Sequence, residues 1–232
     1  MYNCFEDYCM KYKHKYFPAL SLYRFMICIA IFILFVAMVT LFIHNGIKHK
    51  RYEVGLKMSV NILSEALLFV NFLPGIEDVK NDAYYLYMLD VLNSRFKSIN
   101  CAKSKKIICK GKPYKTYNGK ALMSDLLFDT GARIYIGNIF FMVNKPITPT
   151  EPLLVLVDTN GVNVEPNRLG YDVFVFQIIH AKLKAMGNKG TLYPIDKYSF
   201  YCDSRSISKD RLLGANCTYE ALTNPKYFSK LK

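Results

Sequence analysis

The sequence contains none of the short patterns that mark common hydrolase, metalloprotease or nucleotide-binding sites. It has no G-x-S-x-G, no H-E-x-x-H and no P-loop. Histidine is scarce, with four residues scattered along the chain. Asp129-Thr130-Gly131 has the letters of the aspartic-protease tripeptide, but it occurs once, in a predicted hairpin where Asp-x-Gly is ordinary turn chemistry. The sequence therefore predicts that the protein is not an enzyme, and no catalytic residue is assigned.

Long apolar runs are also scarce, with one exception near the start. Phe25 to Ile43 reads FMICIAIFILFVAMVTLFI, without a charged side chain. As a helix this run would cover roughly 28 Å, close to the hydrocarbon thickness of a bilayer. A cleaved secretory signal is usually shorter and ends in small residues, and a buried core helix is the other alternative. We expect a single-pass membrane protein with residues 20–44 as its span.

Cysteine pairs with the spacing of a zinc site are absent as well. Cys4 and Cys9 precede the apolar run and Cys28 lies within it. The other four lie beyond it, at Cys101, Cys109, Cys202 and Cys217. An even number of cysteines suits two disulfides in an oxidising compartment, with three possible connectivities. No pair has C-x2-C spacing and no histidine is near, so disulfides are favoured, and the close pairings 101–109 and 202–217 are one of the three connectivities.

Acidic residues are in the minority, with 18 against 31 basic ones and a net charge of +13. Residues 101–120 contain seven lysines and no acid, together with Gly111, Pro113 and Gly119, and are predicted to form a loop. The candidate phosphate-binding lysines are Lys103, Lys105, Lys106, Lys110, Lys112, Lys115 and Lys120. Tyr114 and Tyr117 are candidates for base stacking. A plain solvated loop is the alternative.

Beyond the apolar run the pattern remains helical and becomes amphipathic. Apolar residues recur at every fourth position from Val54 to Val70. No Gly-Pro break comes before Pro74-Gly75, so one helix is predicted from about Leu22 to Phe72. A second helix is predicted from Asp78 to Lys97.

After Ala121 the hydrophobic pattern becomes that of β-strands. Candidate strands are 126–128, 133–136, 139–143, 153–157 and 173–179. The predicted fold class is α+β: a long N-terminal helix, with a membrane half and an amphipathic half, packed on a small antiparallel β-sheet. The predicted parts are a leader or cytoplasmic tail (1–19), the membrane or filament-core helix (20–44) and an extracytoplasmic globular domain (45–232).

The stretch VDTNGVNVEPNRLGYDVFVFQI, residues 157–178, is the most specific in the chain. It holds side-chain oxygens around Gly161, a set that suits a hard cation such as Ca²⁺. The candidate ligands are Asp158, Asn160, Asn163 and Asp172. The alternative is an Asx-rich turn in which these side chains bond to the backbone, and the closing glutamate of an EF-hand loop is absent.

The order of these segments resembles the type IV pilin-like and type II secretion pseudopilin group of bacterial surface proteins. The resemblance rests on the basic leader, the apolar helix, ILSEAL, LLFDTGARIYI, the 157–178 stretch, GTLYP and the C-terminal cysteine pair. It implies a pilin-like fold and cleavage by a prepilin peptidase between Ala19 and Leu20. Arg24 stands where the group has a glutamate, which favours a minor or divergent subunit, or an uncleaved relative.

The function that this resemblance implies is that of a structural subunit of a type IV pilus-like or type II secretion pseudopilus filament. Its expected partners are other pilin-like subunits, in a helical homo- or hetero-filament, the prepilin peptidase and the inner membrane, with no small-molecule substrate. The outer domain is expected in the periplasm or at the cell surface. One alternative is a membrane-anchored protein that binds DNA or another surface ligand through the Lys-rich loop. A plain anchor without a filament is the other.

Overall fold

The computed structural model describes residues 22–76, 80–101, 109, 111–120, 131–146, 148, 150–203 and 205–231, without the side chains of 22–23 and 41–45. The chain divides into two compact units, residues 1–47 and 48–232. The predicted leader, residues 1–19, lies outside the described residues. The second unit begins close to the predicted start of the globular domain, residue 45.

The described elements are three α-helices, two short 3₁₀ helices and six strands. The helices are α2 (Leu22–Asn71), α3 (Asn81–Arg95) and α4 (Cys217–Thr223), with η4 (Ser199–Cys202) and η5 (Phe228–Lys230). The strands are β1 (Ser98–Asn100), β2 (Ala132–Ile136), β3 (Ile139–Val143), β4 (Leu153–Asp158), β5 (Val173–Ile179) and β6 (Lys182–Ala185). The predicted second helix is thus shorter at both ends, and β1 and β6 are strands that the sequence did not predict.

The strands form one antiparallel sheet in the order β1-β2-β3-β4-β5-β6, so each strand pairs with the next along the chain. Every residue of β3 and β4 is buried. Their continuous apolar sequences follow from this, because both faces of the sheet are covered.

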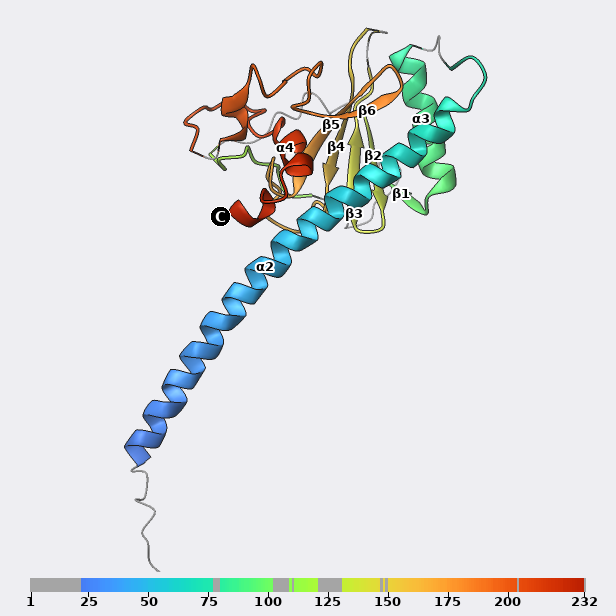
Figure 1. The fold of residues 1–232 in the computed structure, drawn as a ribbon. Helices are drawn as coiled ribbons and strands as arrows, with labels where there is room; N and C mark the ends of the chain where they lie inside the picture. Colours follow the sequence, from blue (N-terminus) through green and yellow to red (C-terminus); the bar gives the residue numbers. More distant parts are fainter. Residues whose placement is uncertain are drawn as a thin grey trace, which may run out of the picture. The chain divides into compact units, whose positions relative to one another are not determined.

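The two faces of the sheet belong to two hydrophobic clusters. Phe141, Val155 and Phe174 face α2 and α3, in a cluster that includes Leu63 and Met88. Neighbouring residues such as Leu156 and Val175 face the other side, which irregular segments cover. Figure 1 shows the later part of α2 and α3 on the same side of the strands. The alternation along each strand therefore reads directly as one face or the other.

The part of α2 in the second unit buries one face against the sheet. Tyr52, Leu56, Leu63, Ala66, Leu67 and Val70 form that face. At Gly55 the helix comes so close to the loop after β4 that a Cβ would lie 2.7 Å from the Thr159 Cβ. A glycine is therefore required where the helix passes this loop.

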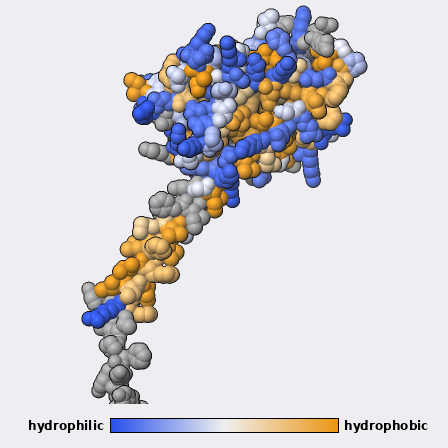
Figure 2. Space-filling view, viewed as in Figure 1, coloured by the Kyte–Doolittle hydropathy of each residue, from blue (hydrophilic) through white to orange (hydrophobic). Residues whose placement is uncertain are grey.

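In the first unit, the described side chains of α2 are exposed and almost entirely apolar. Twelve large apolar residues between Phe25 and Val39 have exposed fractions from 37% to 67%. Figure 2 shows hydrophobic residues covering this part of the helix. Within this unit, the described residues offer these side chains no covering element.

Two predictions about the membrane are wrong. Among the residues that the structure describes, no helix combines the length and the hydrophobicity needed to cross a bilayer. Much of α2 is polar, with five charged residues between Lys48 and Lys57, and its later part belongs to the core of the sheet. This corrects the membrane half of the predicted fold, its pilin-like assignment and the single-pass membrane location; the fold is an α+β domain with a six-stranded antiparallel sheet.

The cysteine prediction fits the structure better. Cys101 is joined to Cys109 and Cys202 to Cys217, with Cα–Cα distances of 5.5 and 5.0 Å. Among the described cysteines, Cys28 is free, and it is exposed. Of the three possible connectivities, the structure has the close pairing.

Candidate functional site

The segment from Asp158 to Asp172, here called the aspartate loop, joins β4 to β5 and contains the most unusual polar chemistry in the second unit. Its ends are tied together, because the Thr159 amide and hydroxyl both donate to the Asp172 carbonyl oxygen, at 2.8 and 3.0 Å. Asp158 and Asp172 are each 0% exposed. The loop therefore places two carboxyl groups inside the protein, close to one another.

Each oxygen of the Asp172 carboxylate accepts a hydrogen bond from the loop's own backbone. Its Oδ2 accepts from the Asn167 amide at 2.9 Å and its Oδ1 from the Arg168 amide at 2.8 Å. Asn167 has φ 49°, a left-handed conformation that asparagine tolerates better than most residues. This conformation accompanies two consecutive amides that donate to one carboxylate.

Asp158 is bonded differently. Its Oδ1 accepts from the amides of Gly161 at 2.8 Å and Asn160 at 3.2 Å. Its Oδ2 is bonded to the Tyr114 hydroxyl at 3.1 Å. A phenol can donate or accept, so the Asp158 Oδ2 can carry a proton without losing its partner.

Burial raises the pKa of both carboxyl groups. For Asp158, burial and then the charge of Asp172 raise the pKa to about 7. For Asp172, burial raises the pKa to about 6, against the lowering effect of the hydrogen bonds from Arg168 and Asn167. No lysine or arginine among the described residues forms an ion pair with either group. Because Asp158 alone has an oxygen that faces a hydroxyl, we assign the first proton to Asp158 and the charge to Asp172.

Helix α2 contributes one side chain to this buried centre. Tyr52 is 2% exposed, and its hydroxyl has no hydrogen-bond partner among the described residues. Burial raises the pKa of Tyr52, and the charges of Asp172 and Asp158 add to the increase. The pKa of the Tyr114 hydroxyl is raised for the same reasons, burial first and Asp158 second.

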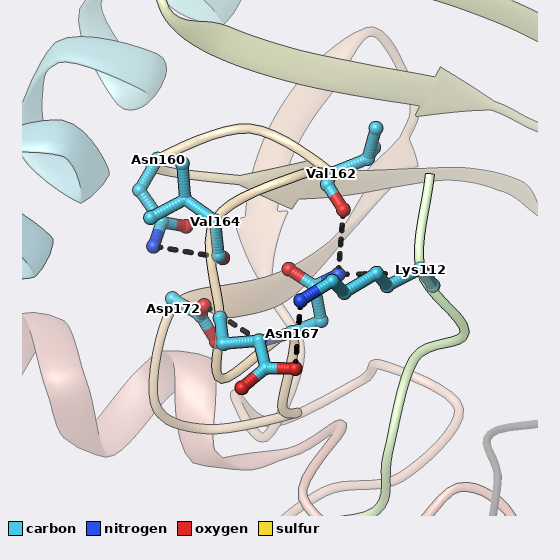
Figure 3. Close-up of polar contacts among 7 residues, drawn as sticks. Lys112, Asn160, Val162, Val164, Asn167 and Asp172 are labelled. Atoms are coloured by element: carbon cyan, nitrogen blue, oxygen red, sulfur yellow. Dashed lines mark hydrogen bonds and ion pairs between the residues drawn. The ribbon is translucent and has the colours of Figure 1, made fainter. Parts of the chain in front are cut away.

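Two asparagines complete the loop. Figure 3 shows the Asn167 side chain beside the Val162 carbonyl and the Asn160 side chain beside Val164. Their Nδ2 atoms donate to the Val162 oxygen at 2.7 Å and the Val164 oxygen at 3.2 Å. Their Oδ1 atoms are buried and accept no hydrogen bond from the part of the chain that the structure describes.

Of the four predicted calcium ligands, the structure places Asp158, Asn160 and Asp172 in this centre and Asn163 at an exposed position of the same loop. The carboxylate oxygens of both aspartates accept hydrogen bonds from the chain itself. Within the described ranges, no three His, Cys, Asp or Glu side chains gather as a metal-binding group. Calcium binding stays a prediction, and what the geometry shows directly is the Asx-rich turn that was its alternative.

The Lys-rich loop is described only in part, as residues 111–120, here called the lysine segment. Lys103, Lys105, Lys106 and Lys110 lie outside the described residues. Lys112 forms an ion pair with Glu165 at 3.0 Å, both side chains being exposed. Lys115 and Lys120 are exposed. Tyr114 and Tyr117 are buried, so their predicted role in base stacking is wrong.

The predicted cleavage residues, Ala19 and Leu20, lie outside the described residues. Sequence reasoning missed Tyr52 and Asn167 as parts of the buried centre. Asn167 follows Pro166 in a stretch that was singled out for other residues, whereas Tyr52 is brought in by a helix more than 100 positions away.

No protein-family model, curated protein or solved structure matches the chain.

Proposed function

We propose that the protein is a structural subunit of a filament of the type IV pilus or type II secretion pseudopilus kind. In this proposal the first part of α2, residues 24–40, packs against the same part of other copies. The observation that carries the proposal is the set of twelve large apolar side chains exposed along this part of the helix. Burying such a side chain contributes about 1.5–3 kcal/mol, so leaving the set in water is costly.

The distribution of these side chains favours a filament over a dimer. Ile31 to Val36 are six consecutive exposed apolar residues, and six residues make more than one helical turn. The apolar surface therefore surrounds the helix instead of forming one stripe. A single partner helix would cover one side only, whereas a helical assembly surrounds each helix with several neighbours. Repeated head-to-tail contacts that do not close form such an assembly.

The test compares two substitutions with matched exposure. Ile33 on α2 is 60% exposed and Leu86 on α3 is 61% exposed. We expect the purified full chain and Leu86→Asp to form filaments, seen by negative-stain electron microscopy and as fast-sedimenting material. Ile33→Asp places a charge in the interface and should leave the chain monomeric. A wild-type chain that stays monomeric at every concentration, or Ile33→Asp filaments, would contradict the proposal.

We also propose that the chain is cut between Ala19 and Leu20 by a prepilin-type peptidase. Support comes from the small residue before the cut and from the resemblance of the segments that follow. N-terminal sequencing of the protein from its own cell should give a chain that starts at Leu20. The variant Ala19→Leu should retain its first residues, and a wild-type chain that starts at Met1 would end this part of the proposal.

A further inference from the structure

Four aromatic rings form a connected cluster in the segment after β6. Tyr193 contacts Tyr198 and Tyr201, with ring centroids 5.5 and 5.6 Å apart. Phe200 lies edge-on to Tyr201, at 4.7 Å. Tyr201 is buried, whereas Phe200 is 49% exposed. We call these four residues the aromatic surface.

The backbone that carries the aromatic surface is held from several directions. The Asn216 Nδ2 donates to the Tyr198 carbonyl oxygen at 2.7 Å. The Tyr201 hydroxyl donates to Asp210, and Cys202 is joined to Cys217. Phe200 is therefore an exposed ring on a fixed support, and presenting it to a ligand costs little additional conformational entropy.

The acidic and basic side chains around this surface differ in whether they already have partners within the protein. Asp196 accepts from the Lys197 amide, and Asp210 accepts from the Leu212 amide as well as from Tyr201. Asp203 pairs with Arg205. The exposed cations Lys197, Lys209 and Arg211 have no acidic partner within the described part of the chain. Asp196 and Asp210 are themselves exposed, but within the described residues neither forms an ion pair with these cations, which remain available to an external anion.

The lysine segment joins the same surface. The Asn118 Nδ2 donates to the carbonyl oxygens of Ser206 at 2.9 Å and Ser208 at 3.0 Å. The Lys120 amide donates to the Asn118 Oδ1 at 3.0 Å. These hydrogen bonds bring the backbone next to Lys120 against the backbone next to Lys209, although the two lysines are far apart in the sequence. In Figure 1 the green trace of residues 111–120 runs beside the orange-red segment between β6 and α4.

From this arrangement we propose that the aromatic surface, with Lys120, Lys197, Lys209 and Arg211, binds single-stranded nucleic acid. Phe200 stacks on a base, and the cations contact the phosphates on either side. Single strands are favoured over a duplex because the exposed ring can reach the face of a base only where that base is unstacked. An acidic protein would use the same cations but would not need the ring face.

The experiment measures binding of the full chain to fluorescein-labelled (dT)20 by fluorescence anisotropy, at several salt concentrations. Phe200→Leu keeps an apolar side chain and removes the aromatic face, and should weaken binding about tenfold with an unchanged salt slope. The double variant Lys209→Gln/Arg211→Gln should reduce the slope of log K against log salt by about 1.4. Circular dichroism of both variants should match that of the wild type.

A matched control removes two exposed lysines elsewhere. Lys80→Gln/Lys97→Gln, at the two ends of α3, has the same change in net charge and should bind as the wild type does. Repeating the titration with Ile33→Asp separates binding from assembly, because the monomer should bind equally well. Absent binding to (dT)20, or equal binding to duplex and heparin with no effect of Phe200→Leu, would overturn the proposal.

Discussion

The aspartate loop and the lysine segment both stand out in the sequence as charged, glycine-containing stretches, yet the structure treats them in opposite ways. The aspartates of the loop are fully buried, and backbone amides and a phenol occupy their oxygens. The cations of the described lysine segment are exposed. Where the backbone supplies donors, a charged motif becomes part of the fold; where it supplies none, the charges remain available to an external ligand.

The substitution Asp172→Asn, in the aspartate loop, should cause the largest loss of stability. Both oxygens of Asp172 accept backbone amides, so either orientation of the new amide places an NH₂ group against an N–H donor. We expect a loss of about 2 kcal/mol in the free energy of unfolding, measured in urea at pH 7, above the pKa of about 6 for Asp172. Asp158→Asn is the matched control, because its NH₂ can donate to the Tyr114 hydroxyl. Equal losses of stability in both variants would contradict the difference between the two aspartates, namely that both Asp172 oxygens accept backbone amides whereas the Asp158 Oδ2 faces a hydroxyl.

The same pair predicts an unusual pH dependence. Because the pKa of Asp158 is raised to about 7, folding takes up a proton between the unfolded pKa near 4 and pH 7. This contribution is complete below pH 4 and is lost as pH rises through the folded pKa. The free energy of unfolding should therefore fall by about 2 kcal/mol between pH 5.5 and 7, at about 1.4 kcal/mol per pH unit.

Urea titrations across this range measure the effect, and Asp158→Asn should abolish most of it. The isosteric amide keeps the hydrogen bond to Tyr114 and cannot titrate. If the wild type becomes more stable from pH 5.5 to 7, the buried proton assigned to Asp158 is not there.

A smaller loss is expected where α2 passes the aspartate loop. Gly55→Ala would place a methyl group 2.7 Å from the Thr159 Cβ and 2.8 Å from its carbonyl oxygen. We expect a net loss of about 1–2 kcal/mol in thermal or urea unfolding, after the gain in helix propensity. Gly46→Ala, in the same helix with nothing within 4 Å of the new Cβ, should not destabilise. Destabilisation by both variants would mean that the helix, not the contact, requires glycine.

The smallest effect belongs to the lysine segment. Lys112 and Glu165 form their ion pair with both side chains exposed. Lys112→Gln and Glu165→Gln should each leave the urea midpoint unchanged within measurement error, because exposed pairs are screened by water and salt. A clear shift of the urea midpoint in either variant would show that this ion pair stabilises the fold, as the hydrogen bonds of the aspartate loop do.

The central strands could be predicted from the sequence because their residues carry the information locally. Ile139–Val143 and Val173–Ile179 have the bounds that the apolar runs indicated. β1 and β6 have three and four residues and no apolar run, and their place comes from pairing at the edges of the sheet. The membrane prediction was wrong because it was made from the apolar run alone. Among the described residues, no helix has the length and hydrophobicity needed to cross a bilayer, and the later part of α2 is charged and packs on the sheet.

The buried centre could be predicted only in part. The pattern identified Asp158 and Asp172, and it identified the turn that uses them. It could not show that the donors to Asp172 are the amides of Asn167 and Arg168, since backbone amides have no sequence signature. Nor could it bring Tyr52 and Tyr114 to the loop, because those contacts depend on how the helix and the irregular segments pack over the sheet.

The strand order has a consequence for how the chain is made. Since every strand pairs with its successor, the sheet can form strand by strand as the polypeptide emerges, with the lowest loop-closure entropy where β2 meets β3 and where β5 meets β6. Helix α2 is synthesised first, but its partners Val155 and Phe174 come about 90 and 110 residues after Leu63. Until β4 and β5 are translated, the apolar face of α2 has no sheet to cover it, and exposed apolar surface of this kind favours aggregation.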